Sequence, residues 1–463
     1  MGSLAIDGLV SGLDTTTLIN QLMSIESQPQ VLLKGKVTTT QTLVKTFQNL
    51  NSSVASLATL AKKTALPATI DLFTASSSAS SVSVTAGAGA SAGAIDLRVT
   101  AVAKAQVSVS AALKSWPDSP ATFTIVRADG TKTEITAAST SLSEVAAAIT
   151  ASSAGVKAAR VAAGSEAGTG DPLYRLQFTS AATGADGAFQ VFRGSAADVT
   201  AGTATNLLTA PGGATVATAS DASVTLWGGT AAEQVITSST NSFADILPGV
   251  TVSISKVEAF PVSITVGRDN AGIGTVASNL VAGIGTVLNF IDDKSVVTQT
   301  TSSTGAAGTT AGVFTGNSTA RDVRAQILTA ATAPVNGRSP SEIGLTITKD
   351  GTVTYDATKF SAALAVDPAG TQSMLNVIAS RVATAADNAS NQYTGTITQV
   401  ITGQKSTLTS LDNQIGNWDV RLASQRSGLE RTYSALEVQL SKLQAQSSWL
   451  TSQLAAFTAG TSK

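Results

Sequence analysis

Apolar side chains recur every three or four residues at both ends of the chain, and at every second residue in its middle. The first spacing is that of a helix with one apolar face, and the second that of a half-buried strand. We therefore predict an α+β multidomain protein, in which N- and C-terminal helices pair and nested β-rich domains are inserted between them. The expected domains are a terminal coiled-coil leg (1–40 and 404–463), a helical bundle with a small hairpin (41–73 and 268–403), a β-rich domain (74–112 and 218–267) and an outer β-rich domain with one helix (113–217).

The first two helices are indicated by a cap, two prolines and an apolar stripe. Asp14 stands before three threonines, as helix N-caps do, and Pro29 bends or ends the helix that follows. A second helix carries apolar residues at alternating spacings of four and three, which is typical of a coiled-coil seam, and stops at Pro67. The predicted seam residues here are Leu18, Leu22, Ile25, Leu43, Phe47, Leu50, Val54 and Leu57.

The last helix, predicted over about 397–457, has the strongest pattern in the chain. One apolar position recurs every seven residues without a gap. A second apolar position lies three residues after the first, is polar at Gln425 and Thr432, and from Tyr433 lies four residues after the first. A single heptad register does not change position, so the seam rotates partway along and its halves face different neighbours. We favour an intermolecular coiled coil; the alternative is an intramolecular bundle helix. The predicted seam is Leu408, Leu411, Ile415, Trp418, Leu422, Leu429, Tyr433, Leu436, Leu440, Leu443, Leu450, Leu454 and Phe457.

The middle of the chain reads as strands and short turns. Asp129-Gly130 predicts a tight turn, and one helix is expected over Leu142 to Ala151. Further helices are expected near 270–292, 318–331, 357–365 and 371–392, with a hairpin turning at Asp350-Gly351 and a low-complexity loop over 298–312. Predicted strands contain Val82/Val84, Ile95/Leu97/Val99, Phe123/Ile125, Val224/Leu226, Val250/Val252/Ile254 and Val262/Ile264/Val266.

The N-terminal arm does not bury enough apolar surface to fold alone. Its first ~35 residues carry 13 large apolar side chains after Met1, each stabilising by ~1.5–3 kcal/mol when fully buried. Ordering the backbone costs ~1–2 kcal/mol for each residue, which is more in total. We expect this arm to be loose in the monomer and to become ordered on assembly.

Composition narrows the function classes. The formal charge is −1 and only 13% of the 463 residues are charged, so no basic surface for nucleic acid is expected. The first basic residue is Lys34, which argues against a cleavable signal peptide, and no run of about 20 apolar residues predicts a membrane span. We expect a secreted protein that leaves the cell by a route reading an uncleaved N-terminus.

Histidine and cysteine are both absent, which removes Ser-His-Asp and Cys-His catalysis, disulfides and the usual metal ligands. Ser253 and Lys256 have the Ser-x-x-Lys spacing but lie on a predicted strand, where they point opposite ways. Asp292-Asp293 is interpreted as a solvated helix end. Gly283-x-Gly285 lies inside a predicted helix and lacks the rest of a dinucleotide fingerprint. We therefore predict no enzyme activity, no cofactor and no metal.

Five segments, in order, carry a family resemblance. The chain resembles bacterial flagellar filament cap proteins, a flagellar hook-associated protein family, over essentially its whole length. One segment is similar to the family's IN motif but has Thr150 in place of Asn. The segments are Ile6 to Asp14, Leu142 to Val161, Asn241 to Thr251 with Val266 to Asp269, Ile343 to Leu345 with Asp350-Gly351 and Tyr355-Asp356, and Leu436 to Leu454.

The resemblance implies a homo-oligomeric ring at the distal tip of the filament, beneath which exported flagellin folds and is inserted. It also implies the flagellar export apparatus and an export chaperone as partners, and no cofactor, nucleic acid or membrane insertion. Whether the β domains bind a surface or host ligand, as a protein of cell adhesion would, is left open. The alternatives are another hook-associated or flagellin-like structural protein, and a coiled-coil surface adhesin.

Overall fold

The computed structural model describes residues 12, 14–301 and 307–460. The chain divides into two compact units: the first comprises Met1–Ile70 and Gly274–Lys463, and the second Asp71–Ile273. The first unit is built mainly from helices and the second from sheets. The predicted α+β class is therefore confirmed, with paired terminal helices and β-rich insertions. The four finer domain boundaries stay a prediction.

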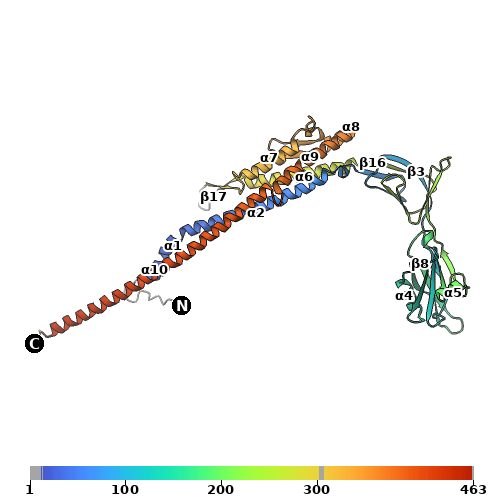
Figure 1. Cartoon of the computed structure of the whole chain (residues 1–463), viewed down its shortest axis with the longest axis horizontal. Coiled ribbons are helices and arrows are strands. Elements are labelled where there is room, and N and C mark those ends of the chain that lie inside the picture. The colour runs from blue at the N-terminus through green and yellow to red at the C-terminus, as the bar shows by residue number, and fades with distance from the viewer. Residues whose placement is uncertain (1–11, 13, 302–306, 461–463) are drawn as a thin grey trace. The chain divides into compact units, whose positions relative to one another are not determined.

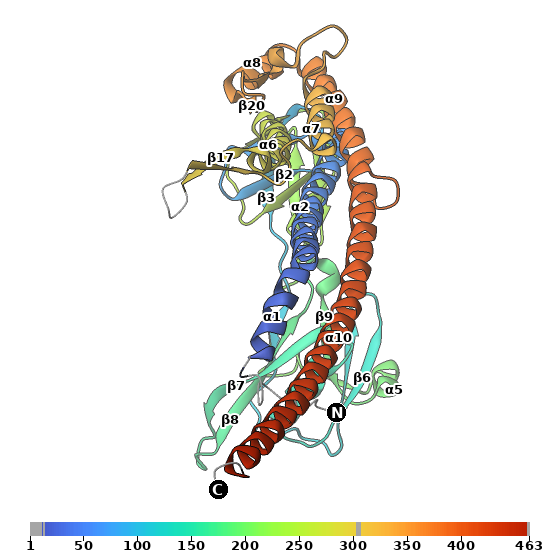
Figure 2. The same cartoon turned by 90° about the vertical axis from the view of Figure 1, so that its left-hand side faces the viewer.

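In the first unit, helices from the two ends of the chain run side by side. Figures 1 and 2 both show α10 lying along α2 and α1, and α9 lying on α2. Two small hairpins complete the unit. Its elements are α1 (Thr15–Glu26), α2 (Gln28–Thr64), α3 (Pro67–Ile70), α6 (Asn270–Ser295), β17 (Val297–Thr301), β18 (Ala307–Ala311), α7 (Ser318–Thr332), the 3-10 helix η2 (Pro340–Ile343), β19 (Leu345–Ile347), β20 (Val353–Tyr355), α8 (Ala357–Val366), α9 (Pro368–Ser390) and α10 (Thr396–Gly460).

Helix α6 packs closely on α2. A Cβ placed on Gly283 would lie 2.9 Å from Leu60 Cδ2 and 3.4 Å from Leu57 Cδ1, so α6 and α2 approach closely because this residue has no side chain. Gly283 is thus a packing residue. By length and hydropathy α6 is the one helix in the described part of the chain that could span a membrane. Its buried residues pack into the bundle core, which accounts for its apolar composition: Ile273, Ala277, Leu280, Val281, Ile284, Val287, Leu288 and Ile291.

The second unit holds two separate hydrophobic cores. The first core includes Val99, Val224 and Ile264 and is formed mainly by residues of two sheets. The strand orders of these sheets are β1-β16-β3-β12-β13 and β14-β15-β2. Their strands are β1 (Phe73–Ser77), β2 (Val82–Ala86), β3 (Gly93–Ala101), β12 (Ala222–Leu226), β13 (Gln234–Ser238), β14 (Ser242–Ala244), β15 (Val250–Ile254) and β16 (Val262–Arg268).

The other core, which includes Phe123, Ile149 and Phe178, lies with sheets ordered β10-β9-β5-β6 and β11-β4-β8-β7 and with helix α4. Its elements are β4 (Val107–Val109), β5 (Ala121–Arg127), β6 (Lys132–Ala137), α4 (Leu142–Ala151), β7 (Val156–Ser165), β8 (Pro172–Ser180), the 3-10 helix η1 (Ala185–Gly187), β9 (Phe189–Arg193), α5 (Ala196–Ala201), β10 (Thr205–Asn206) and β11 (Ala214–Ala217).

Several local predictions are confirmed by the backbone. The Asp14 side chain accepts a hydrogen bond from the amide of Thr17 at 2.8 Å. The hydrogen bond from the Thr17 hydroxyl, together with that from the amide, lowers the pKa of Asp14. Helix α4 has the predicted bounds, and turns at Asp129-Gly130 and Asp350-Gly351 join β5 to β6 and β19 to β20. Residues 1–11 and 13, with the first apolar residues of the arm, lie outside the described residues.

Two predictions about loops and charges are wrong. The segment predicted as a loop over 298–312 contains the antiparallel pair β17–β18, and its β-branched threonines favour the extended conformation of a strand. Asp292 is not merely a solvated helix end: it accepts hydrogen bonds from Arg324 Nε at 2.7 Å and Nη2 at 3.0 Å, which joins α6 to α7.

One ion cluster makes stability in the second unit depend on pH. Lys114 Nζ lies 2.5 Å from Glu166 and 2.7 Å from Asp171, at the end of the β7–β8 hairpin. These contacts lower the pKa values of Glu166 and Asp171 and raise that of Lys114. A carboxyl whose pKa is lower in the folded protein than in the unfolded chain, where it is near 4, stabilises the fold above that pH. This stabilisation is lost as the pH falls through the folded-state pKa, so the cluster stabilises the unit at neutral pH.

We therefore expect Lys114→Met to lower the melting temperature of the second unit at pH 7, and to lower it by less at pH 3, because the stabilisation by the two carboxyls diminishes as the pH falls below about 4. The measurement is thermal unfolding followed by circular dichroism across this pH range. Lys157→Met, on strand β7, serves as a control with the same loss of charge. A difference between wild type and Lys114→Met that persists unchanged at pH 3 would contradict this assignment.

Candidate assembly surface

The leg is defined here as α1, the first three turns of α2, and α10 from residue 404. In it α1 and α2 follow one another and lie antiparallel to α10. Gln30 Nε2 donates to Asp419 Oδ1, and Arg426 Nη2 donates to Asn20 Oδ1 at 3.0 Å. The residue number falls along α10 as it rises along α1 and α2, so the helices run in opposite directions. Two hydrogen-bonded polar pairs thus set the register of the leg.

Helix α1 meets α10 with a mixed face and leaves its apolar stripe open. Thr15 and Ile19 are buried, as is Gln30 at the start of α2, whereas Leu18, Leu22 and Ile25 are exposed. Each residue turns a helix by about 100°, so the exposed stripe lies about a quarter of a turn from the face that packs on α10. Leu32 continues this stripe, 69% exposed. The residues predicted as the seam are therefore not those that hold the helix pair together.

In α10 the predicted seam divides in two. Leu411 is buried, and most residues of the first part are half-buried against α1, α2 and α9. The half-buried members are Leu408, Ile415, Trp418, Leu422, Leu429, Tyr433 and Leu440, while Leu436 is more exposed. The first part of the seam is thus used within the chain.

The second part is the tail, defined here as residues 441–456 of α10, in which every residue is exposed. Leu443, Trp449, Leu450 and Leu454 are between 56 and 62% exposed, and Lys442 is the one charged residue of the tail. Phe457 belongs to α10, but its side chain lies outside the described residues. Large exposed apolar side chains gathered along a helix are typical of an interaction surface.

The tail extends well beyond the helix pair. Asn20 is level with Arg426, so the start of α1 at Thr15 is level with about residue 431 of α10. Helix α10 continues to Gly460, a further ~44 Å at 1.5 Å for each residue. Figure 1 shows this overhang beyond α1.

The predicted seam of the second helix lies in the core of the first unit. Phe47, Leu50, Val54 and Leu57 are at most 2% exposed, and Leu43 is half-buried. Phe47 contacts Phe314, with ring centroids 4.8 Å apart. Placing these residues at an assembly interface was wrong, because their apolar face is already covered by the helices of the same unit.

The candidate catalytic pair is not assembled. Ser253 lies on strand β15, as predicted, between partners Ser242 and Ser83 of the neighbouring strands. Lys256 pairs instead with Glu258, at 3.4 Å. Among the described residues no group of three acidic side chains could hold a metal ion.

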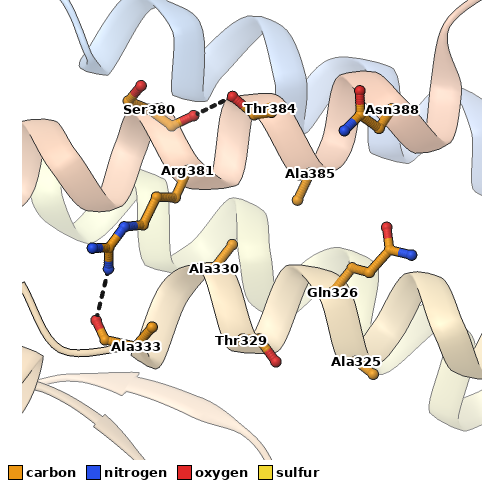
Figure 3. A pocket seen from close by; sticks show the side chains of 10 residues that line it. All are labelled: Ala325, Gln326, Thr329, Ala330, Ala333, Ser380, Arg381, Thr384, Ala385 and Asn388. Carbon is orange, nitrogen blue, oxygen red and sulfur yellow. Dashed lines mark hydrogen bonds between the residues drawn. The ribbon is translucent and has the colours of Figure 1, made fainter.

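A groove of about 600 Å³ lies between α7 and α9 (Figure 3). Arg381 Nη1 donates to the carbonyls of Ala333 and Pro334 at 3.0 and 3.1 Å, and so holds the end of α7. The rest of the lining consists of small and amide side chains, which provide shape but no base or nucleophile: Ala325, Gln326, Thr329, Ala330, Ser380, Thr384, Ala385 and Asn388.

Sequence reasoning missed the polar pairs of the leg. Gln30 and Asn20 interrupt no apolar pattern, and their partners Asp419 and Arg426 are nearly 400 residues away in the sequence. A signal was nevertheless present, because Ile19, Met23, Glu26 and Gln30 follow heptad spacing one residue away from the apolar stripe. A mixed seam of this kind is harder to recognise than one made of leucine.

These features define a class: a multidomain structural protein whose terminal helices form a leg with an exposed apolar tail. Two family models match the chain, Flagellar hook-associated protein 2 N-terminus over residues 11–106 and Flagellar hook-associated protein 2 C-terminus over residues 219–445. Together they cover well over half of the chain, so it belongs to the flagellar hook-associated protein 2 family.

Individual relatives agree with this assignment. The B-type flagellar hook-associated protein 2 of Pseudomonas aeruginosa is 25% identical over 232 residues, 48% of each chain. The lateral flagellar hook-associated protein 2 of Vibrio parahaemolyticus is 24% identical over 144 residues, 30% of this chain and 31% of its own. The matches thus span about half and about a third of these relatives.

A solved structure shares the fold. The D1-D2-D3 domains of the flagellar cap protein FliD from Escherichia coli match with a TM-score of 0.57 and 20% identity, over 78% of this chain and 99% of that one. At this identity the likeness concerns the fold alone.

Proposed function

We propose that this chain caps the bacterial flagellar filament, as a homo-oligomeric ring at its distal tip that promotes folding and insertion of exported flagellin. The observation that carries the proposal is the tail of α10, an exposed, almost uncharged apolar helix extending beyond its intramolecular partner. An exposed apolar surface of this kind is typical of an interaction site, and another helix can cover it. The solved structure with the same fold is that of a flagellar cap protein, which supports the tip of the filament as the place where this chain acts.

In this proposal the tail contacts the growing filament, and the exposed stripe of α1 offers a second apolar surface to neighbouring helices. Both act by packing, so no cofactor or covalent step takes part and the protein is not an enzyme. The export apparatus and an export chaperone are proposed as its further partners, since the cap must leave the cell before it can assemble.

Deletion of the gene tests the proposal. A strain without this chain should keep its hooks, fail to swim and release unpolymerised flagellin into the medium, measured by immunoblot of the culture supernatant. Loss of the hook–filament junction would favour another hook-associated role. Normal swimming would favour a surface adhesin and contradict the proposal.

Polar interruptions in the α10 seam provide a second test. Gln425 is half-buried, and Thr432 and Gln439 are exposed. We expect replacement of all three by leucine to slow filament growth, because a continuous seam would hold each leg in one position while the filament adds subunits. Growth is measured from filament length after shearing, and an unchanged rate would refute this role.

A further inference from the structure

The β17–β18 hairpin of the first unit buries no residue of its two strands. All ten residues of its two strands are exposed, and their register runs from Val297↔Ala311 to Thr301↔Ala307. Both faces and both edges of this two-stranded sheet are therefore open to water. A hairpin with no buried face is marginally stable alone.

The base of the hairpin is nevertheless fixed to the bundle core. The amide of Gly312 donates to the carbonyl of Val296 at 2.9 Å, and that of Phe314 to the carbonyl of Lys294 at 2.8 Å. Phe314 is buried between Phe47 and Phe290, with ring centroids 4.8 and 6.4 Å away. The strands are thus held at a defined place on a rigid support.

The edges of this hairpin lack the protection that sheet edges usually have. No charged residue and no proline occurs between Lys294 and Arg321. Two edge strands of the second unit do carry charge: β6 has Lys132 and Glu134, and β7 has Lys157 and Arg160. Charge and proline on an edge prevent pairing with other strands. The hairpin is therefore free to accept another strand.

We propose that β17–β18 is a docking edge to which an extended, still unfolded stretch of another polypeptide adds as a strand. This inference rests on the proposed function, in which flagellin arrives unfolded. The hairpin offers main-chain donors and acceptors but neither charge nor bulky anchors, so recognition depends on backbone hydrogen bonds and not on sequence. A segment without structure of its own meets that requirement better than a folded second copy.

The test uses the full chain and a fluorescent, uncharged peptide of about ten small and β-branched residues, with binding followed by anisotropy. Thr300→Lys with Thr309→Lys places charge on both strands and should weaken binding about tenfold. The matched control is Ser52→Lys with Thr59→Lys, at exposed positions of α2, and should bind as wild type does. A peptide with proline at every third residue should not bind.

Equal binding by wild type and the Thr300/Thr309 variant would overturn the proposal. So would self-association of the wild type, measured by sedimentation, that the same variant abolishes, since the occupant would then be a second copy. The deletion strain separates this inference from the capping function: normal swimming without the gene refutes capping, whereas the peptide measurement addresses the hairpin alone.

Discussion

Replacing Leu443, Leu450 and Leu454 with glutamine is expected to abolish filament growth while leaving the melting temperature of the purified chain unchanged. All three side chains are more than half exposed, so they contribute little to the folded monomer. Leucine and glutamine also have similar helix propensities, so the tail keeps its helical tendency. If the tail packs on other helices of the filament tip, each replacement removes apolar burial of about 1.5–3 kcal/mol from that contact.

The matched control places the same number of glutamines on the opposite face. Ser441, Ser448 and Ser452 are exposed and lie about half a turn from the three leucines. Their replacement should leave swimming and filament length unchanged. Retained growth in the leucine variant, or equal loss in the serine variant, would show that the apolar stripe is not the contact surface.

The second large effect concerns folding and not assembly. Phe47→Ala is expected to lower the free energy of unfolding of the first unit by about 3–5 kcal/mol, because the side chain is fully buried. Its ring contacts Phe314, so the double variant with Phe314→Ala should lose less than the sum, by a coupling of about 0.5–1.5 kcal/mol.

Urea unfolding followed by the helical circular dichroism signal measures this effect, since the second unit contributes mainly sheet. Phe260→Ala is the control, because Phe260 is 81% exposed and belongs to the second unit. A loss below about 1 kcal/mol for Phe47→Ala would mean that α2 is not packed as described.

Periodicity predicted the element types well where one face of an element is buried. The bounds of α4, the cap at Asp14 and the long α10 all followed from local patterns. It failed for β17–β18, which buries nothing and so leaves no alternation to read.

The candidate site was only partly readable, because a heptad stripe marks an apolar face without naming its partner. The apolar stripe that contains Leu50 is buried by other helices of the same unit, whereas the stripe that contains Leu450 is exposed. Gly283 illustrates the same limit: the closeness of two helices depends on Leu57 and Leu60, more than 200 residues away in the sequence.

The polar pairs of the leg have a consequence for its reach. Antiparallel helices with a repeating seam could slide past one another by seven residues and bring similar side chains together again. Such a slip would move the end of α10 by about 10 Å and would separate both Gln30 from Asp419 and Asn20 from Arg426. These two hydrogen bonds therefore fix how far α10 extends beyond α1, so that the overhang has the same length in every copy of the chain.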